Sequence, residues 1–465
     1  MIQYDNIKKA MGVDIAISTK MANAIYRWSK MYINEVPWLT EDVKSLNLPA
    51  SICSEMARLV TMENQIKITG GQRANLIDRW LNPFRAKLPN YTEYACSTGG
   101  VVFKPYLSPK GIEVDVVRAG DFFPVAFDSA GDITAVIFPE FKRMGKKLYT
   151  RLEYQALQGD TYTIVNKAFM SRKAIVRMDE IINIGQEISL EEVPEWSDIE
   201  PYVELHNADR PLFSYFRIPT ANNIDPASPL GVSVYARASD LIRDADEQYG
   251  ATLWEYRSKE TAIQAADEFF RHTRHGEVIL PKGGDRLYRA MGPGIMDGKG
   301  APFFNAYSPE IRDESFFNGY NRIVQKIEFN CGLAYGTLSD PQVVDKTAEE
   351  ILSSKQRSYA TVKAIQTSLG HAIEGLVGAA DAWLTIAGQY PDSNVEVSCN
   401  WDDSLIVDKK YETEQLRADY SMGVVSRIEY RMKRFGETEQ QARKMLALLD
   451  ETDPDDTGGP DPEEE

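Results

Sequence analysis

The sequence predicts an α+β protein in which a strand-rich antiparallel region is combined with several long helices. The first observation is an alternation of apolar and polar residues over about 100–169. The second is a pair of helical segments separated by a glycine-rich stretch, 272–309. The third is a helix predicted from Thr347 to Ala387, whose apolar residues recur every three or four positions. These patterns indicate several structural regions within one chain of 465 residues.

The opening of the chain is predicted to be helical and the part after it to be a β-meander. Helical spacing of apolar residues is found at 23–33, 48–61 and 76–88. Short turn sequences, with no helix-length gaps, separate the predicted strands, which argues against a doubly wound α/β sheet. The strands are predicted at 100–104, 111–117, 132–138, 147–154 and 161–169.

The middle of the chain is predicted to contain two helices with a small module between them. A connection with six prolines, 189–230, leads to a predicted helix at 232–271. The following stretch, 272–309, contains seven glycines and short extended pieces. A second helix at 310–329 and a short loop at 330–341 complete this region.

The very long helix is marked at its start by a capping box, Thr347 with Glu350. About forty residues at 1.5 Å per residue give a rod of roughly 60 Å. Such a rod must pack against something large, so it favours a component of an assembly over a compact enzyme. Gly370, Gly375 and Gly378 are expected to allow a kink.

The C-terminal part is predicted to contain a strand at 394–401 and two further helices. Capping boxes at Ser426 with Glu429, and at Thr438 with Gln441, predict helices at 427–434 and 439–449. The tail 450–465 carries nine acidic residues and no basic one, and we expect it to be disordered.

Composition limits the class of protein. Hydrophobic content is 43% and charged content 26%, as in ordinary folded proteins. No run of 18 apolar residues predicts a membrane helix, and the N-terminus has no apolar signal core. The four cysteines are widely separated, which predicts reduced, mostly buried thiols. The net charge of −17 leaves −8 outside the tail, and this counts against a protein that grips nucleic acid.

The candidate catalytic and ligand-binding patterns all fail on spacing. Gly292–Gly300 has one residue too many for a Walker A motif and lacks the hydroxyl after Lys299. His272 and His275 lack two further zinc ligands and fit cations near a helix end better. Glu113 and Asp115 alternate as on a solvated strand face. We therefore predict no catalytic residue, no cofactor, no metal and no enzymatic activity.

One basic cluster remains at the start of the very long helix. It consists of Lys346, Lys355, Arg357 and Lys363. Two interpretations stay open, an ordinary solvated helix face and a surface that faces phosphate.

The order of elements, together with several short stretches, resembles the portal proteins of tailed bacteriophages, in the branch found in siphophages of Gram-positive hosts. No single stretch is diagnostic, and the resemblance depends on their order along nearly the whole chain. The stretches are Leu46-Asn-Leu-Pro with Glu55-Met-Ala-Arg-Leu-Val; Glu93-Tyr-Ala through Gly99-Gly-Val-Val-Phe-Lys-Pro-Tyr; Gly336-Thr-Leu-Ser through Thr347-Ala-Glu-Glu-Ile; and Ser421-Met-Gly-Val-Val-Ser-Arg-Ile-Glu-Tyr-Arg-Met-Lys-Arg-Phe-Gly.

The resemblance implies a portal-like fold with an antiparallel β-rich wing, long stem and wing helices, a small clip module and a helical crown. Its implied parts are a wing at 1–230, stem helices at 231–271 and 310–332, and a clip at 272–309. A tunnel loop would follow at 333–346, the long wing helix and a strand at 347–410, crown helices at 411–449, and the acidic tail at 450–465.

The resemblance also implies partners and site residues. The chain would form a ring of about twelve copies at one capsid vertex of the virion, assembled in the host cytoplasm, with double-stranded DNA passing through it. The large terminase subunit, a head–tail adaptor, and the major capsid and scaffolding proteins would be its partners, with no membrane. Lys346, Lys355 and Arg357 would face DNA near the tunnel loop. The clip would dock partners through Arg274, Lys282, Arg286 and Lys299.

Two alternatives stay open. The chain could be another capsid-associated head–tail structural protein, although adaptors are usually much shorter. It could also be a metal-dependent enzyme of nucleic-acid metabolism, against which the failed spacings argue.

Overall fold

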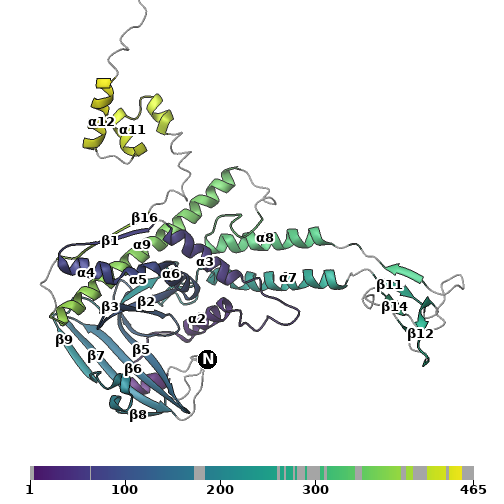
Figure 1. Ribbon diagram of the computed structural model, residues 1–465, viewed down its shortest axis with the longest axis horizontal. Helices are drawn as coiled ribbons and strands as arrows, with labels where there is room; N and C mark the ends of the chain where they lie inside the picture. Colours follow the sequence, from purple (N-terminus) through teal and green to yellow (C-terminus); the bar gives the residue numbers. More distant parts are fainter. Residues whose placement is uncertain are drawn as a thin grey trace, which may run out of the picture. The chain divides into compact units, whose positions relative to one another are not determined.

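The structure is a computed structural model, and it divides the chain into two units, Met1–Trp401 and Asp402–Glu465 (Figure 1). All of the described strands belong to the first unit. The described residues are all except 1–4, 63, 172–183, 259–261, 267–268, 276–277, 280–287, 291–303, 308–309, 311, 341–347, 389–393, 402–415, 436–438 and 453–465.

The largest sheet of the first unit has six strands and contains only the last three strands of the predicted meander, β5, β6 and β7. The strands predicted at 100–104 and 111–117 pair in a separate sheet, so the prediction of one continuous meander is wrong. Its order is β4-β5-β6-β7-β8, and β9 (Tyr202–His206) also pairs with β7. All of these pairings are antiparallel, as the alternating sequence predicts. The other strands are β4 (Phe123–Phe127), β5 (Ile133–Met144), β6 (Lys147–Gln158), β7 (Thr161–Ser171) and β8 (Gln186–Ile188).

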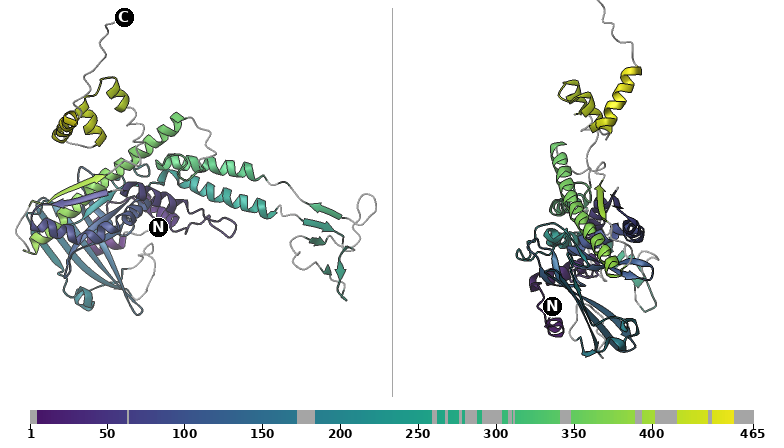
Figure 2. Two further views of the ribbon diagram at one scale, coloured as in Figure 1. Left: turned by 45° about the horizontal axis from the view of Figure 1, so that its top comes forward. Right: turned by 90° about the vertical axis from the view of Figure 1, so that its left-hand side faces the viewer.

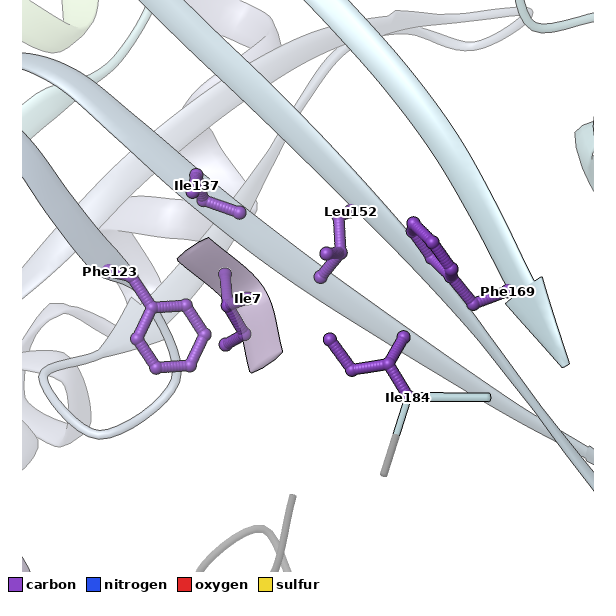
Figure 3. Close-up of a cluster of buried hydrophobic side chains, with 6 residues drawn as sticks. All are labelled: Ile7, Phe123, Ile137, Leu152, Phe169 and Ile184. Carbon is purple, nitrogen blue, oxygen red and sulfur yellow. The ribbon is translucent and has the colours of Figure 1, made fainter. Parts of the chain in front are cut away.

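One hydrophobic core lies against this sheet and is closed by α1 (Asp5–Met11). The alternation of side chains along the strands directs one set of apolar residues to this face. Figure 3 shows the side chains converging, with Ile7 contributed by α1. The buried residues are Ile7, Phe123, Ile137, Leu152, Phe169 and Ile184.

A second, three-stranded sheet lies under the long helix α9 (Ala348–Ile386). Its order is β10-β2-β3, with β2 (Gly100–Ser108), β3 (Gly111–Arg118) and β10 (Ser214–Arg217). α9 packs on β2 and β10, and α3 (Leu48–Thr61) and α6 (Leu88–Thr98) pack on each other beside it. The predicted apolar stripe of α9 is buried, at Val362, Ile365, Leu369, Ile373, Leu376, Ala380 and Leu384.

α9 is one continuous helix of 39 residues, so its three glycines do not divide it. Two of these glycines instead allow other segments to approach the helix closely. A Cβ at Gly375 would lie 2.5 Å from the Oγ of Ser214 on β10. Gly378 likewise faces the guanidinium of Arg210. Gly375 therefore lies close against β10, whereas the flexible Arg210 side chain at Gly378 can move aside.

The remaining elements of the first unit include a sheet of two strands. The strand β1 (Asn64–Thr69) pairs with β16 (Glu396–Trp401), far apart in sequence. The sequence predicted β16 at nearly these bounds but missed β1. Other elements are α2 (Thr19–Tyr32), α4 (Gln72–Trp80), α5 (Asn82–Ala86), η2 (Leu190–Glu192) and η3 (Pro194–Trp196).

Two antiparallel helices, α7 (Ser239–Ser258) and α8 (Asp313–Cys331), lie side by side (Figures 1 and 2). Arg312, at the start of α8, makes two hydrogen bonds to the carboxylate of Glu255 on α7, at 3.0 and 3.1 Å. The bounds of α8 agree with the predicted helix at 310–329 to within three residues at each end.

The prediction of one helix over 232–271 is wrong. Residues 232–235 are buried in irregular structure, where Val234 donates to the carbonyl of Cys96 and the Tyr235 hydroxyl donates to that of Trp28. A 3₁₀ turn, η4 (Ala236–Ala238), then precedes α7. At the N-terminal end of the predicted helix, hydrogen bonds to distant segments take the place of helical ones. Beyond Ser258, the chain pairs as the strand β11 and is no longer helical.

A small β-module follows α7 and precedes α8 in the chain. It begins at β11 (Ala262–Ala265), ten residues before the expected clip boundary at 272. β11 pairs in parallel with β14 and antiparallel with β15 (Phe304–Tyr307), while every other strand pair in the described part is antiparallel. The remaining strands are β12 (Arg271–His272), β13 (Val278–Ile279) and β14 (Tyr288–Ala290).

The second unit is helical over its described residues. Residues 416–421 are helical, followed by α11 (Arg427–Phe435) and α12 (Glu439–Thr452). The capping box at Ser426 is confirmed, because its N–H donates to Glu429 at 3.1 Å and the Glu429 N–H donates to its Oγ at 3.2 Å. α12 includes Asp450–Thr452, so the first three residues of the expected tail are helical, and 453–465 lie outside the described residues.

The structure agrees with the predicted α+β class, with helices and mainly antiparallel sheets. Among the described residues, no helix has the length and apolar character needed to cross a membrane.

Candidate functional site

The best-defined candidate site is the junction between α8, the loop after it and α9. α8 ends at Cys331, and Gly332 adopts a left-handed conformation with φ of 72°. The N–H of Leu333 then returns to the carbonyl of Glu328 at 2.9 Å, and the Leu333 side chain is fully buried. This C-terminal cap directs the chain into the loop 333–340.

Glu328 holds this loop to α8. Its side chain is completely buried, and its carboxylate accepts four hydrogen bonds from the loop. One oxygen accepts the N–H groups of Leu338 at 2.6 Å and Ser339 at 2.9 Å. The other accepts the Ser339 hydroxyl at 2.8 Å and the N–H of Gly336 at 3.3 Å. A buried carboxylate needs such donors, because an unpaired buried charge is strongly unfavourable.

A second residue of α8 extends this attachment. The Oδ1 of Asn321 accepts the N–H of Asp340 at 2.9 Å. Asn321 and Glu328 are seven residues apart, two helical turns, and so lie on the same side of α8. The loop therefore runs along α8 as it leaves the helix.

Arg357 contacts the same region from α9. Its guanidinium carbon lies 4.3 Å from the ring centroid of Phe329 and 5.4 Å from that of Tyr335. Its Nε and Nη2 atoms are buried and lack a hydrogen-bond acceptor. The two aromatic faces provide its electrostatic partners. Arg357 thus joins the end of α8 and the loop to α9.

The backbone of α8 also approaches α9 closely at Gly332. A Cβ at this position would lie 2.6 Å from the Oγ1 of Thr361 and 3.1 Å from its Cβ. Thr361 is itself held by a hydrogen bond to the carbonyl of Arg357 at 3.1 Å. Only glycine fits here, both for its positive φ and for this contact.

Of the residues predicted to face DNA, the structure describes Lys355 and Arg357, and these two do not share one surface of α9. Lys355 is exposed on α9, whereas Arg357 is half-buried as described above. Residues two apart on a helix do not share a face. Lys346 lies outside the described residues. The prediction that these residues face DNA stays a prediction.

The four residues predicted to dock partners can be placed only in part. Arg274 is exposed in the turn between β12 and β13. Lys282, Arg286 and Lys299 lie outside the described residues.

The structure also locates the candidates for catalysis that the sequence analysis rejected. His272 lies on β12 and His275 in the turn after it, so the expected helix end at these histidines is wrong. Asp115 is exposed on β3, and Gly292–Gly300 lies outside the described residues. In the part of the chain that is described, no group of three or more His, Cys, Asp or Glu side chains could hold a metal ion.

A set of large aromatic side chains is exposed on the paired helices. Trp254 on α7 is 67% exposed, and Phe317 and Phe329 on α8 are 54% and 52% exposed. Beside Trp254 is a hollow of about 400 Å³. It is lined by Asp42, Val43, Gly250, Ala251, Trp254 and Arg257.

Sequence reasoning missed the role of Glu328. A single acid in an amphipathic helix is usually a solvated residue, so nothing in its own position predicted burial. The signal that could have identified it is local. Glu328 lies four residues before the helix-ending Gly332, on the side continuous with the buried Val324 and Ile327.

The sequence matches no protein-family model and no curated protein. Comparison with solved structures finds a chain from "Neck of native GTA particle computed with C12 symmetry" at 12% identity. The similarity covers 92% of this chain and 96% of that chain, with a TM-score of 0.42. A similarity at this level does not establish a shared fold or function.

Proposed function

We propose that this chain is a portal protein of a tailed bacteriophage. About twelve copies would form a ring at one capsid vertex, through which DNA is packaged and later ejected. The protein would act as a channel and docking site, without enzymatic activity of its own.

The observation that carries this proposal is the exposure of Trp254, Phe317 and Phe329 on the paired helices. Large aromatic residues are enriched at protein–protein interfaces, where their apolar surface leaves water. Two adjacent rods with such residues suit repeated side-by-side contact between copies. If each contact joins different surfaces of neighbouring copies, closure of the series gives a ring.

The order of the elements supports the same function. A strand-rich region, a helix, a small β-module, a second helix, a loop and a very long helix follow one another. This is the order on which the resemblance to portal proteins depends. In the proposal, α7 and α8 are stem helices, residues 262–307 belong to the clip, and α9 is the long wing helix.

The charge of the chain suits a channel for moving DNA. The net charge of −8 outside the acidic tail would repel phosphate, so that the duplex would not bind tightly to the wall. The loop 333–340 and the residues after it are the proposed contact level. The exposed Lys355 would offer local attraction without a strong hold.

The small module is the proposed docking site for the large terminase subunit and the head–tail adaptor. Phe269 and Phe304 are exposed there, at 54% and 57%, with ring centroids 5.6 Å apart. Arg274 adds an exposed cation. Capsid and scaffolding proteins would contact the outer parts of the ring.

Substitution of Phe317 by Ser tests the proposed contact. Phe317→Ser should shift the mass distribution from rings toward monomers in native mass spectrometry, because the contact loses apolar area. Phe304→Ser removes a similarly exposed phenylalanine from the module and should leave the rings intact. Equal oligomer distributions for the wild-type chain and Phe317→Ser would contradict the assignment of this surface.

A further inference from the structure

We propose that Glu328 is the positioning residue of the loop 333–340, and that Arg357 secures the same loop to α9. The end of α8, the loop and the start of α9 would then move as one body. This inference deepens the proposed function and rests on it, since that function puts the loop beside the DNA path.

The hydrogen bonds of Glu328 specify the backbone conformation of the loop. Three of its four donors are main-chain N–H groups, from Gly336, Leu338 and Ser339. These groups point at one carboxylate only when the loop curves around it. The conformation is therefore set by Glu328 as well as by the loop's own side chains.

A carboxylate is required at this position, and an amide cannot replace it. Both oxygens of Glu328 accept two hydrogen bonds each. Glutamine has the same size but presents N–H donors in place of one of these oxygens. Two loop donors would then face another donor, and hydrogen bonds to a charged acceptor would become bonds to a neutral one.

Arg357 provides the attachment on the side of α9. Its planar guanidinium contacts the rings of Phe329 and Tyr335, which belong to α8 and to the loop. Lysine would keep the charge but cannot stack as a flat group on two rings. We therefore expect the contribution of Arg357 here to depend on its shape and not on its charge alone.

The attachment has a functional consequence because of the segment that comes after the loop in the chain. Asp340, held by Asn321, is followed directly by residues 341–347, which include Lys346 of the predicted DNA-facing set. The anchored loop fixes where that segment starts.

Hydrogen–deuterium exchange of the full chain tests the inference directly. In Glu328→Gln, amide exchange in 333–340 should be at least about tenfold faster than in the wild type. A tenfold change in the opening equilibrium of the loop corresponds to a loss of about 1.4 kcal/mol in the stability of its closed conformation. Exchange in α7 should stay unchanged. Glu314→Gln, an exposed acid on the same helix, is the matched control and should alter neither region. Unchanged exchange in 333–340 of Glu328→Gln would overturn the inference.

A second variant keeps the test decisive if Glu328→Gln fails to fold. Ser339→Ala removes the hydroxyl donor but keeps the three N–H donors. It should give a smaller acceleration confined to 333–340. Wild-type exchange in this variant as well would overturn the inference.

The functional readout is the length of DNA packaged per particle by phage that carry each variant. Glu328→Gln should form rings and package less DNA, and Arg357→Lys should share this defect. Normal packaging by rings with a loosened loop would overturn the positioning role. Absence of rings for the wild-type chain would instead overturn the proposed function, while the exchange result would still decide whether Glu328 holds the loop.

Discussion

The carboxylate of Glu153 on β6 is buried between two cations. The Nζ of Lys104 on β2 lies 2.7 Å from it, and a guanidinium nitrogen of Arg151 lies 3.2 Å from it. Gln155 also donates to this carboxylate. Burial alone raises the pKa of Glu153, but Lys104 and Arg151 lower it by more, so the net pKa lies below its ordinary value of 4.5.

Replacement of Lys104 should therefore destabilise the chain. Lys104→Met leaves a buried carboxylate short of one cation and should lower the free energy of unfolding by about 3 kcal/mol. Lys110→Met, at an exposed position just after the same strand, should change it by less than about 0.5 kcal/mol. Urea unfolding at pH 7 measures both, and equal values for the two variants would contradict this account.

The lowered pKa of Glu153 also determines whether the stability of the folded chain rises or falls with pH. The unfolded chain binds a proton to this group more readily than the folded chain does. The contribution of the group to stability is therefore present above about pH 4.5 and lost as pH falls through the lower, folded pKa. The loss of stability on acidification should be smaller in Lys104→Met, because the pKa of Glu153 is lowered less when Lys104 is absent.

The four thiols provide another test at the scale of single residues. Cys53, Cys96 and Cys331 are buried, and burial raises the pKa of each well above its ordinary range. Cys399 is half-buried, and burial raises its pKa to about 11. At pH 8 a disulfide reagent should label only Cys399 in the folded chain, and that reaction should be slow. In the chain unfolded by guanidinium, all four thiols should react. The variant Cys399→Ser should show no native labelling, and rapid labelling of it would contradict the described burial.

At the scale of elements, the contact between α8 and α9 through Gly332 is testable with a matched pair. Gly332 and Gly388 both have positive φ, at 72° and 60°, but only Gly332 of the two faces a close neighbour, Thr361. Gly332→Ala should cost about 1–3 kcal/mol more stability than Gly388→Ala, because an added methyl group must displace Thr361. Thr361→Ala should recover most of that difference. Equal costs for the two glycines, measured by urea unfolding, would contradict the contact.

Local sequence signals predicted the bounds of some elements well. They failed where contacts with distant parts of the chain determine the conformation. The bounds of α3 and the apolar stripe of α9 follow from helical periodicity. α6 was not predicted, although Pro89 near its start and Gly99 after its end are standard signals. The helix containing α7 was predicted too long at both ends. At its N-terminal end, the apolar residues around Val234 are buried by contacts with distant helices and not by helical packing.

The candidate site was predicted only as a location. Sequence reasoning identified the loop after the second stem-like helix, and the structure describes that loop up to Asp340. It did not predict that Glu328 holds the loop, because a buried carboxylate is recognised by donors that come from another segment. It also assigned Arg357 by its charge, whereas two aromatic rings decide where its guanidinium lies.

At the scale of the whole molecule, the proposed portal function requires association between copies of the chain. The first unit has its own core, yet it leaves Trp254, Phe317 and Phe329 exposed on two adjacent helices. Large aromatic side chains are enriched on surfaces that another protein covers. We infer that these helices are covered in the assembled state.

The most direct test is negative-stain electron microscopy of the purified chain, with native mass spectrometry of the same sample. If the chain is a portal protein, the sample should contain rings with a central channel and about twelve copies. A stable small oligomer without a channel would contradict it and favour another head–tail structural protein.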